Sequence, residues 1–366
     1  MKFDIEQAPF LSALSLAQTV ADRRSTMPVL ANVLLTADSK GSVTCSATDM
    51  MIAVSERVPA EVSTPGGLTL GVRHLHALVR TLTGGSLSIE RLDNHWAQIL
   101  ASRSEFKLMG MPDTDFPELP DPGKQKFTQV SAAGLLDLVS RTLFSVSTDE
   151  ARVNLNGALF ECDGTQATMV STDGHRLTKF SAAFAGPKLD EGIIIPRKGL
   201  LELKRVLDRF DEHCEMAVSG QHLFVRDERL TLSVKLNSVR FPPYQQVIPA
   251  SHDRRAQASR AELMAALRSV VVLAPEKTAT VRVQLETGNL ALTADNPDAG
   301  VAHQELPVEY EGDSLVAGFN AHYLLAALEA MDTENIELEF QGELDPCVLR
   351  PVDGPDFLAV VMPMRI

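Results

Sequence analysis

Aromatic residues are scarce in this chain of 366 residues, where they make up 5% with one tryptophan and three tyrosines. A cleft that stacks sugar rings, or a platform that stacks single-stranded bases, is therefore excluded as the dominant theme. Any core must be aliphatic, and the 45% of hydrophobic residues is enough to build one. The four cysteines lie far apart without a C-x-x-C pair, so neither a zinc site nor a disulfide framework is expected.

Long apolar runs and catalytic motifs are also missing. The run at residues 270–274 is far shorter than the ~20 residues of a membrane span, and the N-terminal residues have no signal pattern. We therefore expect a cytoplasmic protein with reduced thiols and no membrane partner. The chain has no phosphate-binding loop, dinucleotide fingerprint, serine-nucleophile elbow or zinc-helix motif. No metal, no cofactor and no catalytic residue is expected.

The formal net charge of −14 argues against a protein that simply coats nucleic acid. The acidic excess is uneven, because residues 254–366 carry 8 Lys and Arg against 18 Asp and Glu. Positive charge is thus concentrated in the first two thirds of the chain. An acidic protein of this kind can still present a basic face.

A strand-like segment that ends in a small-residue and aspartate turn occurs three times. The aspartates are Asp49, Asp173 and Asp295, at spacings of 124 and 122 residues. We predict one helix before each strand, at residues 10–20, 132–144 and 260–271, and one after it, at residues 72–82, 197–207 and 319–330. Short strands with Gly, Asp and Asn turns fill the rest. The chain therefore reads as a threefold repeat.

Proline-rich connectors at residues 118–123 and 242–249 separate the units. They divide the chain into three α+β domains of one kind, at residues 1–122, 127–250 and 254–366, each with two helices packed on antiparallel sheets. Catalytic constellations are normally single, so a structure repeated three times favours a surface or a ring. The repeated aspartate is best explained as a side chain that caps the turn after a strand.

Two acidic motifs are candidate sites. Asp113 and Asp115 have a spacing that suits a divalent cation, but an acidic solvated turn is favoured because no further ligands are near. Asp173 and His175 could orient a general base. The intervening Asp-Gly step is also a strong hairpin signal, and no Ser or Cys nucleophile is tied to it. A turn is favoured over binding, and binding over catalysis.

The helices expected at residues 72–82 and 197–207 each carry a basic stripe opposite an aliphatic one. Arg197, Lys198, Lys204 and Arg205 share a face of the second of these helices, and Arg73 and Arg80 share a face of the first. Such a stripe is often only a solvated surface. Its recurrence in two repeats makes contact with phosphates more attractive, and this contact would be independent of sequence. The third helix has His322 and Glu329 instead.

Several strings together resemble one family. They are Met1-Lys2-Phe3, Leu155-Asn156-Gly157, the run from Ser171 to Leu177, Pro196-Arg197-Lys198-Gly199, Arg240-Phe241-Pro242, and the run from Val360 to Arg365. The chain resembles, from end to end, the bacterial sliding clamps, the beta subunits of DNA polymerase III. The length and the threefold repeat agree with this resemblance independently.

The resemblance implies a head-to-tail homodimer whose six domains close a ring around duplex DNA, with helices lining the bore. Such a clamp is a non-catalytic processivity factor that binds DNA without reading sequence. The implied partners are the catalytic subunit of DNA polymerase III, the clamp loader, and other clamp-motif proteins such as translesion polymerases, mismatch repair factors and ligase. The alternative is a cytoplasmic hydrolase that uses Asp173 and His175.

Three sets of residues follow from the resemblance. The pocket for partner peptides comprises Leu155, Thr172, Gly174, His175, Arg176, Leu177, Pro242, Val247, Val360, Val361, Met362, Pro363, Met364 and Arg365. The DNA contacts are Arg24, Arg73, Arg80, Arg152, Arg197, Lys198 and Arg205. The dimer interface places Phe106 and Leu108 on one side and Val272 and Leu273 on the other.

The chain departs from the family pattern at three positions. Gln246 stands where many relatives have Arg, and Val153 and Asn154 replace aromatic residues that some relatives have near DNA. The departures put a charged peptide contact and an aromatic DNA contact in doubt.

Overall fold

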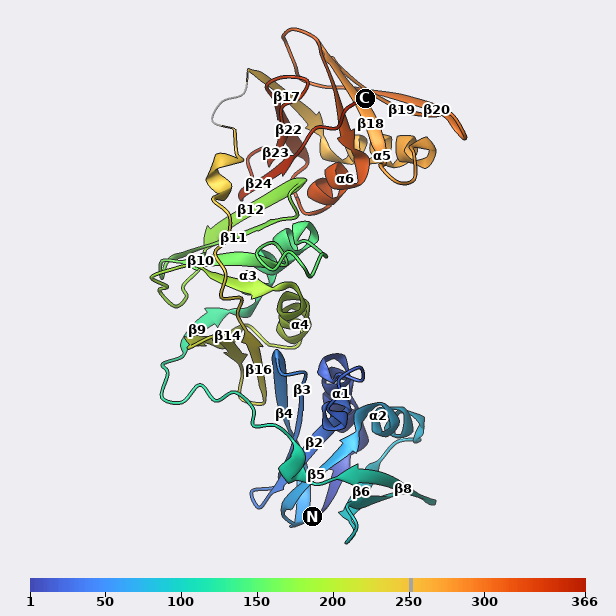
Figure 1. Ribbon diagram of the computed structural model, residues 1–366, viewed down its shortest axis with the longest axis vertical. Coiled ribbons are helices and arrows are strands. Elements are labelled where there is room, and N and C mark those ends of the chain that lie inside the picture. Colours follow the sequence, from blue (N-terminus) through green and yellow to red (C-terminus); the bar gives the residue numbers. More distant parts are fainter. Residues whose placement is uncertain (250–252) are drawn as a thin grey trace. The chain divides into compact units, whose positions relative to one another are not determined.

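The computed structural model describes residues 1–249 and 253–366 (Figure 1). The expected domain boundary at residue 250 lies outside the described residues. The chain divides into two compact units, one of Met1–Ala132 and Arg205–Leu236, the other of Ala133–Lys204 and Asn237–Ile366. The mixed helix and sheet content confirms the predicted α+β class.

The same order of elements occurs three times: strand, helix, four strands, helix and three strands. The first repeat consists of β1 (Lys2–Glu6), α1 (Gln7–Val20), β2 (Asn32–Asp38), β3 (Ser42–Thr48), β4 (Ile52–Thr64), β5 (Gly66–Gly71), α2 (Val72–Thr81), β6 (Ser86–Arg91), β7 (Trp96–Ala101) and β8 (Ser104–Met111). The second consists of β9 (Thr128–Ser131), α3 (Ala132–Thr142), β10 (Gly157–Cys162), β11 (Gln166–Thr172), β12 (Arg176–Ala183), β13 (Ile193–Pro196), α4 (Arg197–Leu207), β14 (His213–Ser219), β15 (His222–Arg226) and β16 (Leu230–Lys235).

The third repeat continues this order. It consists of β17 (Arg254–Ser259), α5 (Arg260–Val270), β18 (Thr280–Glu286), β19 (Asn289–Asn296), β20 (Gly300–Pro307), β21 (Leu315–Asn320), α6 (Ala321–Glu329), β22 (Asn335–Phe340), β23 (Cys347–Pro351) and β24 (Asp356–Val361). Short 3₁₀ turns follow α3 at Leu143–Ser145 and α5 at Val271–Leu273. Each repeat thus supplies eight strands and two helices.

The strands of the described residues form three antiparallel sheets. The first unit holds a sheet of 12 strands in the order β1-β6-β7-β8-β5-β2-β3-β4-β16-β15-β14-β9. The second unit holds a sheet of 8 strands, β13-β10-β11-β12-β24-β23-β22-β17, and one of 4 strands, β20-β19-β18-β21. The larger sheets both continue from one repeat into the next, through β4–β16 and β12–β24. We call these two pairings the first joint and the second joint.

Aliphatic side chains are the most numerous in the cores, but most of the phenylalanines are buried there too, so the prediction of an aliphatic core is wrong. Helix α1 packs on α2 and covers β3 and β4 (Figure 1). Its side chains Phe10, Leu14 and Val20 are buried. Helix α5 packs in the same way on α6 and on β19 and β20, with Leu263 and Leu267 buried. One helix of each pair therefore spreads over a sheet.

Two sequence predictions of local structure are wrong in the third repeat. The helix expected to begin at residue 319 begins at Ala321, because the Asn320 side chain accepts hydrogen bonds from the N–H groups of His322 and Tyr323. Asp295 does not cap a turn, since it lies within β19 opposite Val301. In this longer hairpin Asn296 makes the turn contact instead, accepting from the N–H of Asp298.

Candidate functional site

The hairpin between β11 and β12 confirms that Asp173 is a turn residue. Its carboxylate accepts hydrogen bonds from the backbone N–H groups of His175, at 2.9 Å, and Arg176, at 3.1 Å. Gly174 takes φ +90°, a conformation that glycine adopts at low cost. The Thr172 hydroxyl donates to the Arg176 carbonyl at 2.6 Å. Asp173 thus contacts the backbone of His175 rather than its ring, which does not match a carboxylate–imidazole dyad.

Arg176 is held by contacts within the protein. Its Nε donates to the other oxygen of Asp173 at 3.0 Å, and its Nη2 donates to the Phe144 carbonyl at 2.6 Å. The guanidinium lies 4.4 Å from the ring centre of Tyr323 and 5.4 Å from that of Phe144. Both rings provide cation–π attraction. Arg176 therefore fixes the hairpin to the 3₁₀ turn after α3 and to α6.

The second joint brings the C-terminal segment next to this hairpin. Leu177 lies opposite Val360, and the N–H of Met362 donates to the His175 carbonyl at 2.9 Å. Leu177 and Val360 belong to a buried apolar cluster that also includes Leu159, Val170, Ile194, Tyr244, Val348 and Leu358, with partly buried Phe241 and Ile248 packed against it. Most of the expected pocket residues are thus brought together in one unit.

The remaining residues of the expected pocket lie around this cluster. Val247 is 43% exposed and Met362 is 37% exposed, so both present apolar surface to solvent. The N–H of Met364 donates to the Gly318 carbonyl at 2.8 Å, and this pairing attaches the tail to β21. Leu155 and Pro242 are half-buried, and Arg365 is exposed. In the sequence, Val247 and Met362 each follow shortly after a buried member of the cluster, Tyr244 and Val360.

A hollow of about 720 Å³ borders the hairpin. Its walls include Asp149, Arg152, His175, Arg176, Arg197, Lys204 and Tyr323. Sequence reasoning left Lys204 and Tyr323 out of the site. Lys204 could have been found, because it lies on the predicted basic stripe. Tyr323 could not, because nothing in the sequence pairs it with Arg176.

The basic stripes have the exposure that the sequence predicts. On α2, Arg73 and Arg80 are exposed while Leu75 and Val79 are buried. On α4, Lys198 and Arg205 are exposed and Arg197 is half-buried. Arg24 is exposed before β2, and Arg152 is paired with Asp149 at 3.3 Å. Arg24, Arg73, Arg80, Lys198 and Arg205 are therefore exposed, whereas Arg197 is partly covered.

The residues expected at the dimer interface lie at two sheet edges. Phe106 and Leu108 are half-buried on β8, and Val272, next to β20, is 76% exposed. Beyond its two-residue contact with β5, β8 has no strand on its far side in the described part of the chain. β20 is likewise an outer strand of its sheet. Both edges offer unpaired backbone groups.

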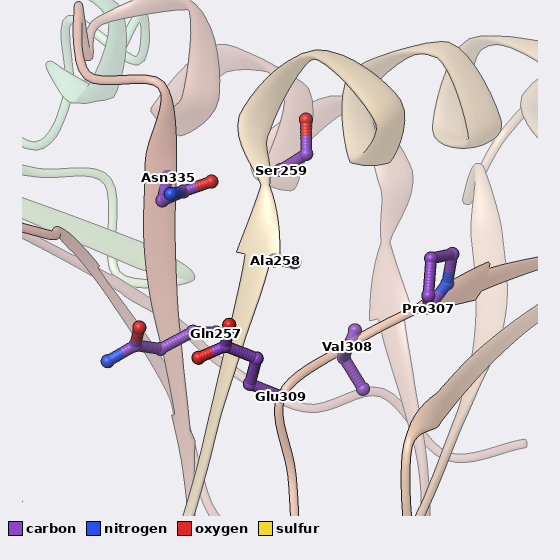
Figure 2. A pocket seen from close by; sticks show the side chains of 7 residues that line it. All are labelled: Gln257, Ala258, Ser259, Pro307, Val308, Glu309 and Asn335. Atoms are coloured by element: carbon purple, nitrogen blue, oxygen red, sulfur yellow. The ribbon is translucent and has the colours of Figure 1, made fainter.

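A smaller hollow of about 280 Å³ lies in the third repeat (Figure 2). Figure 2 shows Gln257 and Glu309 on neighbouring segments, whose backbones exchange hydrogen bonds of 3.0 and 2.8 Å. A matching hollow of about 500 Å³ occurs in the first repeat, at Asp4 and Ser86. Because the hollow recurs where the side chains differ, it is a feature of the fold.

The four cysteines are free and buried. Burial raises the pKa of the Cys214 thiol to about 12, and it also raises the pKa values of Cys45 and Cys347. Asp113 is paired with Arg91 at 3.4 Å. Across residues 1–249 and 253–366, no group of three acidic, His or Cys side chains is arranged to hold a metal.

The helices in the described residues include none that is long and apolar enough to cross a bilayer.

Comparison with known proteins identifies the family. The family models for the N-terminal, central and C-terminal domains of the DNA polymerase III beta subunit match residues 1–120, 129–243 and 245–365. The beta sliding clamp of Pseudomonas aeruginosa is 33% identical over 369 residues, and that of Escherichia coli is 30% identical over 367, each covering 100% of both chains. A crystal structure of the Pseudomonas aeruginosa subunit has a TM-score of 0.94 at 32% identity, again over 100% of both chains.

These relatives are not hydrolases, and the alternative that uses Asp173 and His175 has no support from them. The three domain matches cover nearly the whole length, in the order that the internal repeat requires. The chain belongs to the DNA polymerase III beta subunit family, the bacterial sliding clamps.

Proposed function

We propose that two copies of this chain close head to tail into a ring of six repeats around duplex DNA. The ring is a non-catalytic processivity clamp, which tethers the replicative polymerase through the peptide pocket at the second joint. The clamp loader and other clamp-motif proteins would use the same pocket. The observation that carries this proposal is the pattern of strand pairing between repeats.

Each joint pairs the fourth strand of one repeat with the eighth strand of the next. The first joint pairs β4 with β16, and the second pairs β12 with β24. In a single chain this rule leaves two strands without a joint. They are the fourth strand of the third repeat, β20, and the eighth strand of the first, β8. Both are the open edges described above. Pairing β20 of one copy with β8 of another closes the ring, and two-fold symmetry makes this third joint occur twice.

The register of the third joint follows from the other two. The first joint places Leu232 opposite Val54, and the second places Ala359 opposite Thr178. The eighth strands of the three repeats can be aligned through the strands that precede them. In this alignment Phe106 is equivalent to Leu232 and Ala359, because each of the three lies opposite the equivalent residue of its preceding strand. The fourth strands align in the same way through the strands that precede them, and His303 is then equivalent to Val54 and Thr178.

Phe106 of one copy should therefore lie opposite His303 of the other. The same register sets Leu108 against Val301, which is 63% exposed in the single chain. The half-buried and exposed apolar side chains at both edges, including Val272 and Leu273, would then be covered together.

Disulfide trapping tests this register. Opposite residues of antiparallel strands have Cα atoms about 4.5–5.5 Å apart, within the range of about 4.4–6.8 Å that a disulfide spans. Phe106→Cys combined with His303→Cys should give a covalently linked dimer under mild oxidation. The control pairs Phe106→Cys with Glu305→Cys, which is displaced by about 7 Å along the strand. Because the native thiols are buried, they should not interfere. Equal trapping in both variants would contradict the register.

DNA contact should come from the basic stripes of α2 and α4. A protein with a net charge of −14 and locally basic helices suits weak, delocalised phosphate contacts, which permit sliding. Replacing Arg197, Lys198 and Arg205 with Glu should reduce retention on circular DNA while leaving the fold intact. Wild-type protein should leave DNA once the circle is cut. Binding that survives linearisation would contradict topological encirclement.

A further inference from the structure

We propose that the hollow beside the β11–β12 hairpin binds an acidic side chain of a partner peptide whose apolar anchors occupy the pocket at the second joint. This inference rests on the peptide-binding role proposed above and names a further recognition element of that site. The ligand chemistry is a carboxylate.

The hollow is lined by two cations that have no acidic partner among residues 1–249 and 253–366. Arg197 and Lys204 lie seven residues apart on α4, so the helical repeat places them on one face, and both line the hollow. Arg197 Nε is buried and has no hydrogen-bond partner within the described residues. Buried N–H donors are rarely left unsatisfied, because they lose water without replacement. An oxygen acceptor from a ligand would satisfy this donor.

The acidic side chains around the hollow are already engaged. Asp173 is paired with Arg176 at 3.0 Å and accepts two turn N–H groups. Asp149 is paired with Arg152 at 3.3 Å and also accepts the N–H of Ala151 at 3.0 Å. The positive charges of Arg197 and Lys204 are therefore not cancelled locally, and the hollow attracts an anion.

The position of the hollow favours a peptide carboxylate over a DNA phosphate. His175 and Arg176 line the hollow and also belong to the hairpin that pairs with the C-terminal segment. A peptide anchored on the exposed side chain of Met362, whose N–H donates to the His175 carbonyl, can thus reach the hollow with a flanking residue. A volume of about 720 Å³ accommodates a glutamate side chain. A half-enclosed phosphate site would also hold DNA at one position, which conflicts with sliding.

Paired peptides test the proposal with the full-length protein. Each probe carries the same leucine and phenylalanine anchors, flanked on both sides by glutamates or, in the matched probe, by glutamines. In fluorescence anisotropy the glutamate peptide should bind about tenfold more tightly. Lys204→Gln should reduce this ratio to about twofold or less and leave the affinity of the glutamine peptide unchanged. Lys188→Gln, which removes the same charge elsewhere, should preserve the ratio.

The outcomes separate this inference from the proposed function. If both peptides bind wild-type protein equally, or if Lys204→Gln weakens both alike, the carboxylate site is refuted and the peptide pocket stands. If neither peptide binds, both proposals fail. If Lys204→Gln weakens retention on circular DNA while the peptide ratio persists, the hollow contacts phosphate and the inference is wrong.

Discussion

The hairpin turns of the first and second repeats have the same backbone hydrogen bonds. Asp49 accepts from the N–H groups of Met51 and Ile52, as Asp173 does from His175 and Arg176. The strand that crosses from the next repeat also attaches at the same point. Lys235 N–H donates to the Met51 carbonyl at 2.8 Å, and Met362 N–H donates to the His175 carbonyl at 2.9 Å.

The side chains on these matching backbones differ. The first turn has Met50 at φ +73° where the second has Gly174, and buried Ile52 where the second has Arg176. Only Arg176 reaches across to aromatic rings and a carbonyl. The comparison teaches that the joint belongs to the fold, whereas the proposed peptide site belongs to the side chains of the second joint.

The largest expected effect separates the two joints by function. Met362→Asp should weaken binding of a clamp-motif peptide by about 100-fold, roughly 2.7 kcal/mol, because it places a charge in the apolar site. Lys235→Asp changes the equivalent position of the first joint and should leave peptide affinity within about twofold. Titration of labelled peptide measures both constants, and size-exclusion chromatography checks that each variant keeps the oligomeric state of the wild-type protein. Comparable losses in the two variants would show that the joints are not functionally distinct.

A second pair of substitutions compares the side-chain interactions that stabilise the two joints. Arg209 binds Glu56 through both Nη atoms, at 2.8 and 2.5 Å, in the first joint. In the second joint Arg141 donates to the Ala330 carbonyl at 2.6 Å, binds Asp332 and lies 5.1 Å from the ring centre of Phe180. The Arg141 side chain is 13% exposed and that of Arg209 is 28% exposed. The second joint therefore has the more buried arginine.

Replacing either arginine with Ala should lower the free energy of unfolding by about 2 kcal/mol. The loss should be larger for Arg141→Ala than for Arg209→Ala, because the first leaves both a carbonyl and a carboxylate without their partner. Arg268→Ala removes an exposed pair with Glu329 and should cost below about 1 kcal/mol. Urea denaturation at fixed protein concentration measures all three. A smaller loss for Arg141→Ala than for Arg268→Ala would overturn this ranking.

The sequence predicts the parts of this fold that depend on local pattern. The helix at residues 197–207 has the predicted bounds, and Asp49 and Asp173 cap turns as expected. Asp295 does not, because the third hairpin is longer and pairing extends past the aspartate. The length of a turn depends on how far the two strands pair, and the aspartate that recurs in the three repeats does not determine this.

The non-local features were beyond sequence reasoning. Helical periodicity places Lys204 beside Arg197, but the hollow that they line also needs Tyr323 from another repeat. The same holds for Arg176, which was expected among the pocket residues and lies close to the rings of Phe144 and Tyr323. Periodicity orders residues on one element, whereas such contacts depend on how the elements pack. The expected peptide, DNA and dimer residues stay predictions until they are tested.

The smallest expected effect exchanges the residues that distinguish the two turns. Gly174→Ala should lower the free energy of unfolding by about 1 kcal/mol, since a side chain at φ +90° is strained. Met50→Gly should raise it by up to about 1 kcal/mol by relieving the strain at φ +73°, reduced by the greater entropy of glycine in the unfolded chain. Opposite shifts of the urea midpoint would show that one backbone geometry governs both turns. If Met50→Gly destabilises instead, contacts of the Met50 side chain outweigh the strain, and the turns are equivalent in hydrogen bonding alone.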